Sequence, residues 1–236
     1  MPITRFHFAA LALFAAALPF AGRAAAGEAA HYSLDPVHTR VMFAIEHAGF
    51  SKAIGTVSGS TGSLVFDPDD WTSARLQASV PMTRVDLGDA GWNKATLAGN
   101  LLDVEDHPTA EFVSTRVEPA APGRASVHGT LTLRGVSREI VLDVTLNAAK
   151  RHPLPPFRRT VGFSATAMLS RKDFGIDAWP SVIGDAVELR IEAEATRSRA
   201  DDNGDADAPD AADAASSSPD ATPAHAPTEP TTEPAP

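Results

Sequence analysis

The stretch TRVMFAIEH, residues 39–47, alternates apolar and polar side chains and thereby indicates how the chain folds. In an extended segment, Val41, Phe43 and Ile45 project to one side, whereas neighbours such as Arg40 project to the other. A period of two residues is typical of a β-strand that buries one face. The stretch therefore predicts a half-buried strand.

The same alternation returns in four further segments. Their apolar faces consist of Ala74, Leu76, Ala78 and Val80; Val127, Leu131 and Leu133; Val161, Phe163, Ala165 and Ala167; and Val187, Leu189, Ile191 and Ala193. Turn-forming residues separate the segments at 67–70, 119–123, 134–136 and 151–156. Eight or nine antiparallel strands at this short spacing, each with one polar face, are typical of a β-sandwich or a closed β-barrel.

One segment departs from the β pattern. Residues 89–102, DAGWNKATLAGNLL, place Trp92, Ala95 and Leu102 at helical spacing, and Asp89 is a suitable N-cap. We expect one short helix that lies against the β structure.

The amino-terminal residues have the features of an export signal. Arg5 supplies positive charge, an apolar run follows, and Ala24 and Ala26 fit the small-residue pattern of a cleavage site. We therefore expect residues 1–26 to be a signal peptide that is removed on export. The chain contains no cysteine, which excludes disulfides and thiol redox chemistry in the exported protein.

The carboxyl-terminal residues 200–236 carry nine acidic and no basic side chains. Such a composition predicts a disordered acidic tail. Most of the formal net charge of −10 belongs to this tail, so residues 27–199, long enough for one domain with one core, are nearly neutral. The domain therefore shows no overall basic character that would indicate a nucleic-acid partner.

Motifs for catalysis are absent from the sequence. Asp173-Phe174-Gly175 matches the magnesium-binding tripeptide of protein kinases, but no glycine-rich phosphate loop or His-Arg-Asp motif precedes it. No G-x-S-x-G elbow indicates a nucleophile. The sequence also lacks H-x-H and H-E-x-x-H, and His38 and His47 would lie on opposite faces of one strand. We therefore predict no catalytic residue, no metal site and no cofactor.

Several inward positions of a barrel would be small, which bears on whether the interior is hollow. These positions are Ala44 or Ala78, Gly129, Ala165, Ala167 and Ala193. A barrel of about eight strands either fills its interior with side chains or holds one small ligand. Small residues leave room for a ligand, but the helix and the aromatic residues could equally fill that room, so the pattern alone leaves both readings open.

Four stretches in order along the chain point to a known family. They are LDPVHTRVMFAIEHAGFSKAIGTVSGSTGSLVFDP, LLDVEDHPTAEFVST, VHGTLTLRGVSREIVLDV, and LSRKDFGI followed by VIGDAVELRIEAEA. Together they resemble the YceI-like family over residues 31–195. The resemblance implies a periplasmic, lipocalin-like antiparallel barrel of about eight strands that holds an isoprenoid quinone, a polyprenyl lipid or a fatty amide.

The same resemblance explains the kinase-like tripeptide. Arg171, Asp173, Phe174, Gly175 and Ile176 match an element that precedes the last strand in the family. The expected structure is a turn in which Gly175 permits an unusual backbone angle and Phe174 plugs the barrel end. Arg171 and Asp173 would then satisfy backbone groups of the turn.

The resemblance and the inward faces together predict the ligand site. The predicted lipid-binding residues are Phe43, Ile45, Phe66, Leu76, Val80, Trp92, Leu97, Phe112, Leu131, Leu133, Phe163 and Leu189, with His47 as a candidate contact to a polar head group. More simply, His47 would hydrogen-bond across a strand end.

The function expected is that of a periplasmic carrier or buffer of a lipophilic molecule, in transient contact with a membrane. A role in stress response and a homodimeric state are left open. Two alternatives also stay open, namely a barrel enzyme of isomerase or cyclase type acting on an apolar substrate, and a scaffold module without a ligand.

Overall fold

The computed structural model describes residues 29–198. The predicted signal peptide and acidic tail lie outside these residues. The strands are β1 Ala30–Leu34, β2 Arg40–His47, β3 Ser51–Ser58, β4 Thr61–Phe66, β5 Arg75–Pro81, β6 Val85–Asp86, β7 Thr109–Ala121, β8 Arg124–Leu133, β9 Val136–Arg151, β10 Arg159–Ser170 and β11 Ile183–Arg197. The helices are α1 Ala90–Leu97 and the 3₁₀ turns η1 Trp71–Ser73, η2 Met82–Arg84 and η3 Arg171–Phe174.

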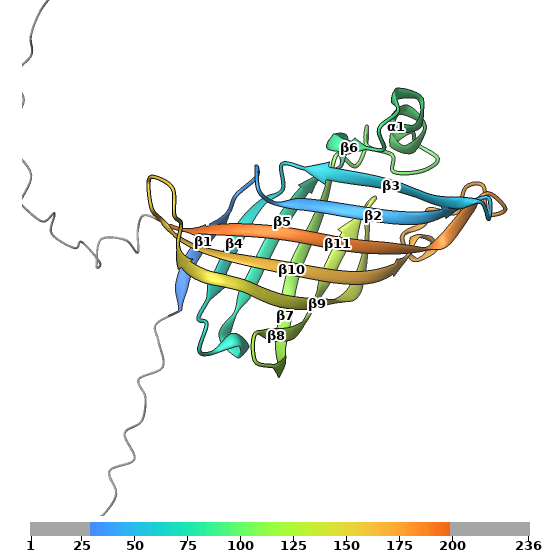
Figure 1. The fold of residues 1–236 in the computed structure, drawn as a ribbon. Coiled ribbons are helices and arrows are strands. Elements are labelled where there is room, and N and C mark those ends of the chain that lie inside the picture. Colours follow the sequence, from blue (N-terminus) through green and yellow to red (C-terminus); the bar gives the residue numbers. More distant parts are fainter. Residues whose placement is uncertain (1–28, 199–236) are drawn as a thin grey trace, which may run out of the picture. The chain divides into compact units, whose positions relative to one another are not determined.

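The strands form one antiparallel sheet that closes on itself as a barrel (Figure 1). The order around the ring is β1-β4-β5-β7-β8-β9-β10-β11, and β1 pairs again with β11 to close it. The remaining strands, β2, β3 and β6, extend the sheet from β11. The prediction of an antiparallel barrel with one helix is confirmed, and the sandwich alternative is wrong.

Eleven strands give eight barrel positions because three positions are interrupted. Both β1 and β2 pair with β11, through Tyr32 with Arg197 and through Phe43 with Leu189. At the next position, β4 pairs with β1 and β3 pairs with β2. At the third position, β5 pairs with β4 and β6 pairs with β3. Each of these pairs is one long strand with a break, and the eight positions follow one another as an up-and-down meander.

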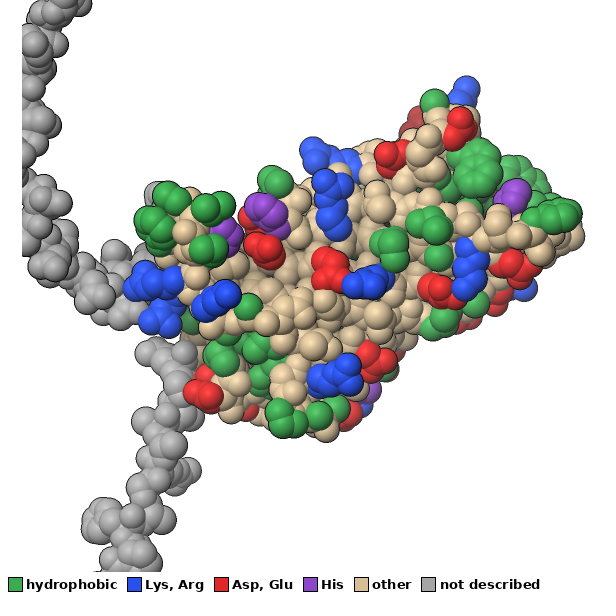
Figure 2. All heavy atoms as spheres, viewed as in Figure 1, with side chains coloured by type: hydrophobic (Ala, Val, Ile, Leu, Met, Phe, Trp, Pro, Cys, Tyr) green, Lys and Arg blue, Asp and Glu red, His purple; other side chains and the backbone are tan. Residues whose placement is uncertain are grey.

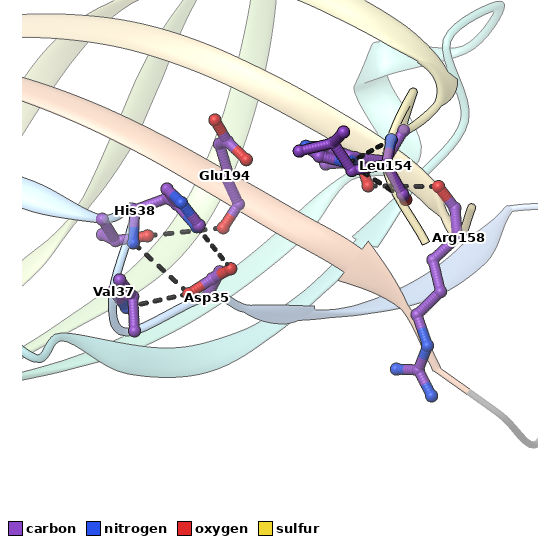
Figure 3. Close-up of polar contacts among 9 residues, drawn as sticks. Asp35, Val37, His38, Leu154, Arg158 and Glu194 are labelled. Atoms are coloured by element: carbon purple, nitrogen blue, oxygen red, sulfur yellow. Dashed lines mark hydrogen bonds and ion pairs between the residues drawn. The ribbon is translucent and has the colours of Figure 1, made fainter. Parts of the chain in front are cut away.

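The break between β1 and β2 is a turn held by Asp35 (Figure 3). Its carboxylate accepts hydrogen bonds from the Val37 N–H at 2.8 Å and the His38 N–H at 3.3 Å. It also contacts the His38 ring nitrogen Nδ1 at 2.7 Å, which raises the pKa of His38. His38 therefore lies in a turn, and its predicted place in one strand with His47 is wrong.

Helix α1 begins where the sequence predicts and ends earlier. The Asp89 carboxylate caps it by accepting from the Trp92 N–H at 2.9 Å. The helix stops at Leu97 instead of Leu102, because Ala98 is extended, and Leu101 is buried in a cluster that also contains Phe174. No residue of α1 is buried, and in Figure 1 the helix stands beyond β3 and β6 at one end of the barrel.

Candidate ligand-binding cavity

The barrel encloses a cavity of about 520 Å³. This volume lies within the range of roughly 300–1,000 Å³ that is usual for small-molecule sites. The lining is apolar except for a few side chains, which are Thr39, Glu46, His47, Thr96, Ser60, Ser114 and Arg171. A ligand held here must therefore be largely apolar, since buried polar groups without partners would cost free energy.

Eleven of the twelve predicted lipid-binding residues line this cavity. They are Phe43, Ile45, Phe66, Leu76, Val80, Trp92, Phe112, Leu131, Leu133, Phe163 and Leu189, and His47 lines it as well. The exception is Leu97, which packs in a cluster with Val57, Met82 and Val85 instead. Leu97 comes five residues after Trp92 and projects from another side of α1, so its predicted place in the cavity wall is wrong.

The small residues that were predicted to face inward do not all leave space in the cavity. Ala78, Ala165 and Ala193 line the cavity as predicted, whereas Ala167 does not. At Gly129, however, a Cβ would lie 2.4 Å from the Phe112 ring, so the ring already occupies that space. Ala44 points to the other face from Phe43 and Ile45, and it does not line the cavity. The cavity therefore depends on alanines and not on glycines.

Aromatic side chains close one end of the cavity. The Phe66 ring meets Trp71 and Phe163 edge-on, with ring centroids 5.2 and 5.3 Å apart. Beneath them, Val161 and Ala195 are fully buried. Edge-to-face packing of this kind is favourable and rigid. The β1 end of the barrel is therefore a packed floor.

The other end forms a mouth. Trp92 of α1 and Trp179 of the 177–182 loop both line the cavity, and each is about half exposed. The Trp92 ring lies 5.3 Å from the His47 ring, which makes no hydrogen bond within residues 29–198; its predicted bond across a strand end is not observed. Figure 2 shows hydrophobic side chains gathered at this end, which is the right-hand end of the barrel.

The two loops of the mouth are joined, and both carry apolar side chains. The Ala48 N–H donates to the Val182 carbonyl at 2.6 Å, which ties the β2–β3 turn to the 177–182 loop. Phe50, in the same turn, is 91% exposed. We call Phe50, Trp92, Trp179 and Val182 the mouth collar. Trp179 was not among the predicted site residues, because it lies in an irregular loop that has no periodicity to interpret.

The kinase-like tripeptide forms the turn that precedes β11, as predicted. Gly175 has a φ of +71°, and the Phe174 ring is fully buried. Arg171 is only 4% exposed, and its guanidinium donates to the carbonyls of Ile176, Gly184 and Ile183 at 2.7, 2.7 and 2.9 Å. A buried cation thus ties the turn to the start of the last strand.

The carboxylate that serves this turn is that of Asp185, and the prediction for Asp173 is wrong. The Asp185 side chain accepts from the Ser170 hydroxyl at 3.0 Å and from the Lys172 N–H at 3.1 Å. Partial desolvation acts to raise the pKa of Asp185, but these hydrogen bonds and the charges of Lys172 and Arg171 together hold it below its usual value. Asp173 contributes its N–H, which donates to Ser170.

Asp185→Asn is expected to remove a pH-dependent part of the stability. Because the pKa of Asp185 is lowered in the folded state, its contribution is present above the unfolded value of about 3.9 and is lost as the pH falls through the folded value. Melting temperatures of the variant and of the unsubstituted protein should differ most at neutral pH and converge under acid. Asp173→Asn is the control and should leave the melting temperature unchanged at each pH. A gap that stays constant from neutral pH into acid would contradict this account.

The described residues contain no constellation that indicates catalysis. Within 29–198, no group of three or more His, Asp or Glu side chains could hold a metal ion. In the same part of the chain, no helix is long and apolar enough to cross a membrane. What the arrangement can do chemically is to enclose an apolar molecule and offer it a few polar contacts, from Glu46 and His47, at the mouth.

Comparison with known proteins agrees with this geometry. The YceI-like domain model matches residues 32–195. The chain belongs to the YceI-like family. The match begins in β1 and ends in β11, so the YceI-like domain includes all eight barrel positions and the whole cavity.

Relatives of this YceI-like chain are known from several bacteria. A UPF0312 protein of Pseudomonas paraeruginosa is 34% identical over 191 residues, which cover 80% of this chain and 96% of the relative. A UPF0312 protein of Serratia proteamaculans is 32% identical over 173 residues, 72% of this chain and 88% of the relative. These alignments extend over nearly the whole length of both relatives.

Solved structures share the fold. BcnA of Burkholderia cenocepacia matches with a TM-score of 0.62 at 21% identity, covering 68% of this chain and 98% of that protein. A polyisoprenoid-binding domain from Saccharophagus degradans, implicated in plant cell wall breakdown, matches with a TM-score of 0.54 at 16% identity, covering 71% and 98%. At such identities the likeness concerns the YceI-like barrel itself.

Proposed function

We propose that this protein binds one long lipophilic molecule, such as an isoprenoid quinone, a polyprenyl lipid or a fatty amide, and acts in the periplasm as its carrier or buffer. The observation that carries the proposal is the apolar cavity of about 520 Å³, which is closed by aromatic packing at one end and flanked by an apolar collar at the other. The polyisoprenoid-binding domain of like fold supports the same class of ligand.

The orientation of the ligand follows from where the polar groups lie. The floor at Phe66, Trp71 and Phe163 offers only apolar contacts, so it suits the end of a hydrocarbon tail. The polar lining residues at the mouth are Glu46 and His47, on the last two positions of β2, and Thr96 of α1. We infer that a head group remains at the mouth, beside His47 and Trp92, while the tail extends toward the floor.

The energetics favour exchange with a membrane over capture from water. One five-carbon unit contributes roughly 4 kcal/mol on transfer from water, at about 0.8 kcal/mol for each CH₂. Eight such units would exceed the practical affinity limit of about 20 kcal/mol. The free energy of binding should therefore be compared with that of the ligand in the bilayer. In the complex, the cavity takes the place of the bilayer as the apolar surroundings of the tail. Transient contact of the mouth collar with a membrane would spare the ligand a passage through water.

A transfer experiment tests this proposal. We expect the purified protein to move a fluorescent polyprenyl lipid from donor to acceptor vesicles at a rate proportional to protein concentration. Phe50→Ser should slow transfer without lowering the amount of lipid bound at equilibrium, because Phe50 belongs to the collar but not to the cavity lining. Val141→Ser, an exposed apolar residue on the barrel wall, is the matched control. If the protein neither extracts nor transfers the lipid, the carrier proposal is wrong.

A further inference from the structure

A second surface with a distinct composition lies at the opposite end of the barrel from the mouth. The loop between β9 and β10 has the sequence KRHPLPPFRR, residues 150–159. Two basic residues on each side enclose an apolar, proline-rich centre. β10 runs from this loop at Arg159 to the mouth end at Ser170, so one strand connects the two ends. We call residues 150–159 the basic hairpin.

The centre of the basic hairpin presents apolar side chains to solvent. Leu154 is 64% exposed and Phe157 is 53% exposed. The loop is nevertheless well defined by backbone hydrogen bonds, from the His152 N–H to the Arg158 carbonyl at 2.8 Å and from the Phe157 N–H to the Leu154 carbonyl at 2.9 Å. The Leu154 N–H also donates to the His152 ring at 3.2 Å (Figure 3). The fold therefore holds two large apolar side chains outside its core.

Three of the four cations of the hairpin are available to a partner. Within residues 29–198, the side chains of Lys150, Arg151 and Arg158 form no ion pair, and Figure 3 shows the Arg158 side chain directed away from the barrel. The carboxylates of β11 beside the hairpin have other contacts. Glu192 accepts from Ser164 and Arg190, and Glu194 lies close enough to His38 to raise its pKa.

The arrangement segregates charge in a domain that is nearly neutral. Figure 2 shows Lys and Arg side chains grouped beside hydrophobic ones at the left-hand end of the barrel, where the β9–β10 loop lies in Figure 1. Cations that surround exposed apolar side chains match a bilayer surface in two ways. The cations meet lipid phosphates, and the apolar side chains enter the boundary between head groups and acyl chains.

We propose that the basic hairpin docks the protein on a membrane that carries anionic phospholipids. A nucleic acid or an acidic protein would be attracted by the same cations, but neither needs two exposed apolar side chains at the centre of the cluster. Docking by this end leaves the mouth directed away from the bound bilayer surface. The proposal is therefore independent of ligand binding, and each can fail without the other.

The absence of cysteine makes a site-specific test straightforward. Leu154→Cys, Phe50→Cys and Thr166→Cys place one environment-sensitive fluorophore on the hairpin, the mouth collar and the barrel wall, respectively. Vesicles of phosphatidylcholine alone are compared with vesicles of equal parts phosphatidylcholine and phosphatidylglycerol. We expect the hairpin label, unlike the barrel-wall label, to shift to the blue on the anionic vesicles and not on the neutral ones, with a response that weakens as salt is added. A shift of the mouth-collar label on both kinds of vesicle would report the separate, transient contact of the mouth during ligand transfer.

Charge and apolar variants complete the test. Arg151→Gln with Arg158→Gln should weaken partitioning onto the anionic vesicles by about 25-fold, from about fivefold for each charge. Arg84→Gln with Arg138→Gln, two exposed cations away from the hairpin end of the barrel, should change it little. Leu154→Ser with Phe157→Ser should also release the protein.

Three outcomes would overturn the proposal. The first is equal binding to neutral vesicles. The second is an equal loss of binding in the Arg84 and Arg138 control. The third is that the hairpin binds a soluble polyanion while the protein does not bind vesicles.

Discussion

Ala165→Trp is expected to lower the affinity for the lipophilic ligand by about a thousandfold while the barrel remains folded. Ala165 lies in β10 and lines the cavity. An indole at this position would occupy the space of about one five-carbon unit, and losing the burial of that unit costs about 4 kcal/mol, or about a thousandfold in affinity. Because the indole enters a cavity of about 520 Å³, the strain of overpacking should be small.

The neighbouring residue supplies the control. Thr166 follows Ala165 in β10 and is exposed on the outer face, so Thr166→Trp adds the same group to the same strand without entering the cavity. Ligand titration and thermal melting of both variants separate binding from stability. Ala193→Leu, a smaller addition to the lining from β11, should cause a smaller loss. Equal affinities for all variants would mean that the ligand does not occupy this cavity.

Arg171→Leu is expected to lower the free energy of unfolding by about 4 kcal/mol, because a buried acceptor that loses its donor costs about 1–3 kcal/mol and three are affected. The guanidinium donates to three backbone carbonyls, those of Ile176, Ile183 and Gly184, in a site that is almost closed to water. Leucine fills much of the volume but donates nothing. The connection between the η3 turn and β11 should loosen.

Urea denaturation of a small series measures this effect. Arg171→Lys keeps the charge but not the planar fork of donors, so it should recover only part of the stability. Arg138→Leu, at an exposed arginine that among residues 29–198 bonds only to the Ser137 carbonyl, should change stability little. A loss below about 1 kcal/mol for Arg171→Leu would mean that water replaces the guanidinium and that Phe174 alone holds the turn.

The fold could be predicted largely because strand alternation is a strong signal. Val41, Phe43 and Ile45 face inward as their spacing indicates, and they line the cavity. The breaks between β1 and β2, β3 and β4, and β5 and β6 could not be placed. The Asp35 turn is a local signal for the first of them, but the partner strand that each half meets is a property of the closed sheet.

The site was predicted where periodicity applies and missed where it does not. Leu97 was misplaced because it does not share the helical face of Trp92 and Ala95, which line the cavity. Gly129 looked like empty space because the sequence does not show that the Phe112 ring covers it. Trp179 and Asp185 lie in or beside an irregular loop, where contacts are made by the tertiary fold. The only signal in the sequence for Trp179 was that its side chain is aromatic.

The most direct test of the central claim is mass spectrometry of the protein expressed with its own amino-terminal segment and purified from the periplasm without detergent. Native and denaturing spectra of one sample report, respectively, the bound mass and the processed chain. We predict a stoichiometric adduct that is lost in Ala165→Trp and kept in Thr166→Trp, with an extracted mass that matches a quinone, a polyprenyl lipid or a fatty amide. A ligand-free mass that stays unchanged after incubation with membrane lipids would contradict the account.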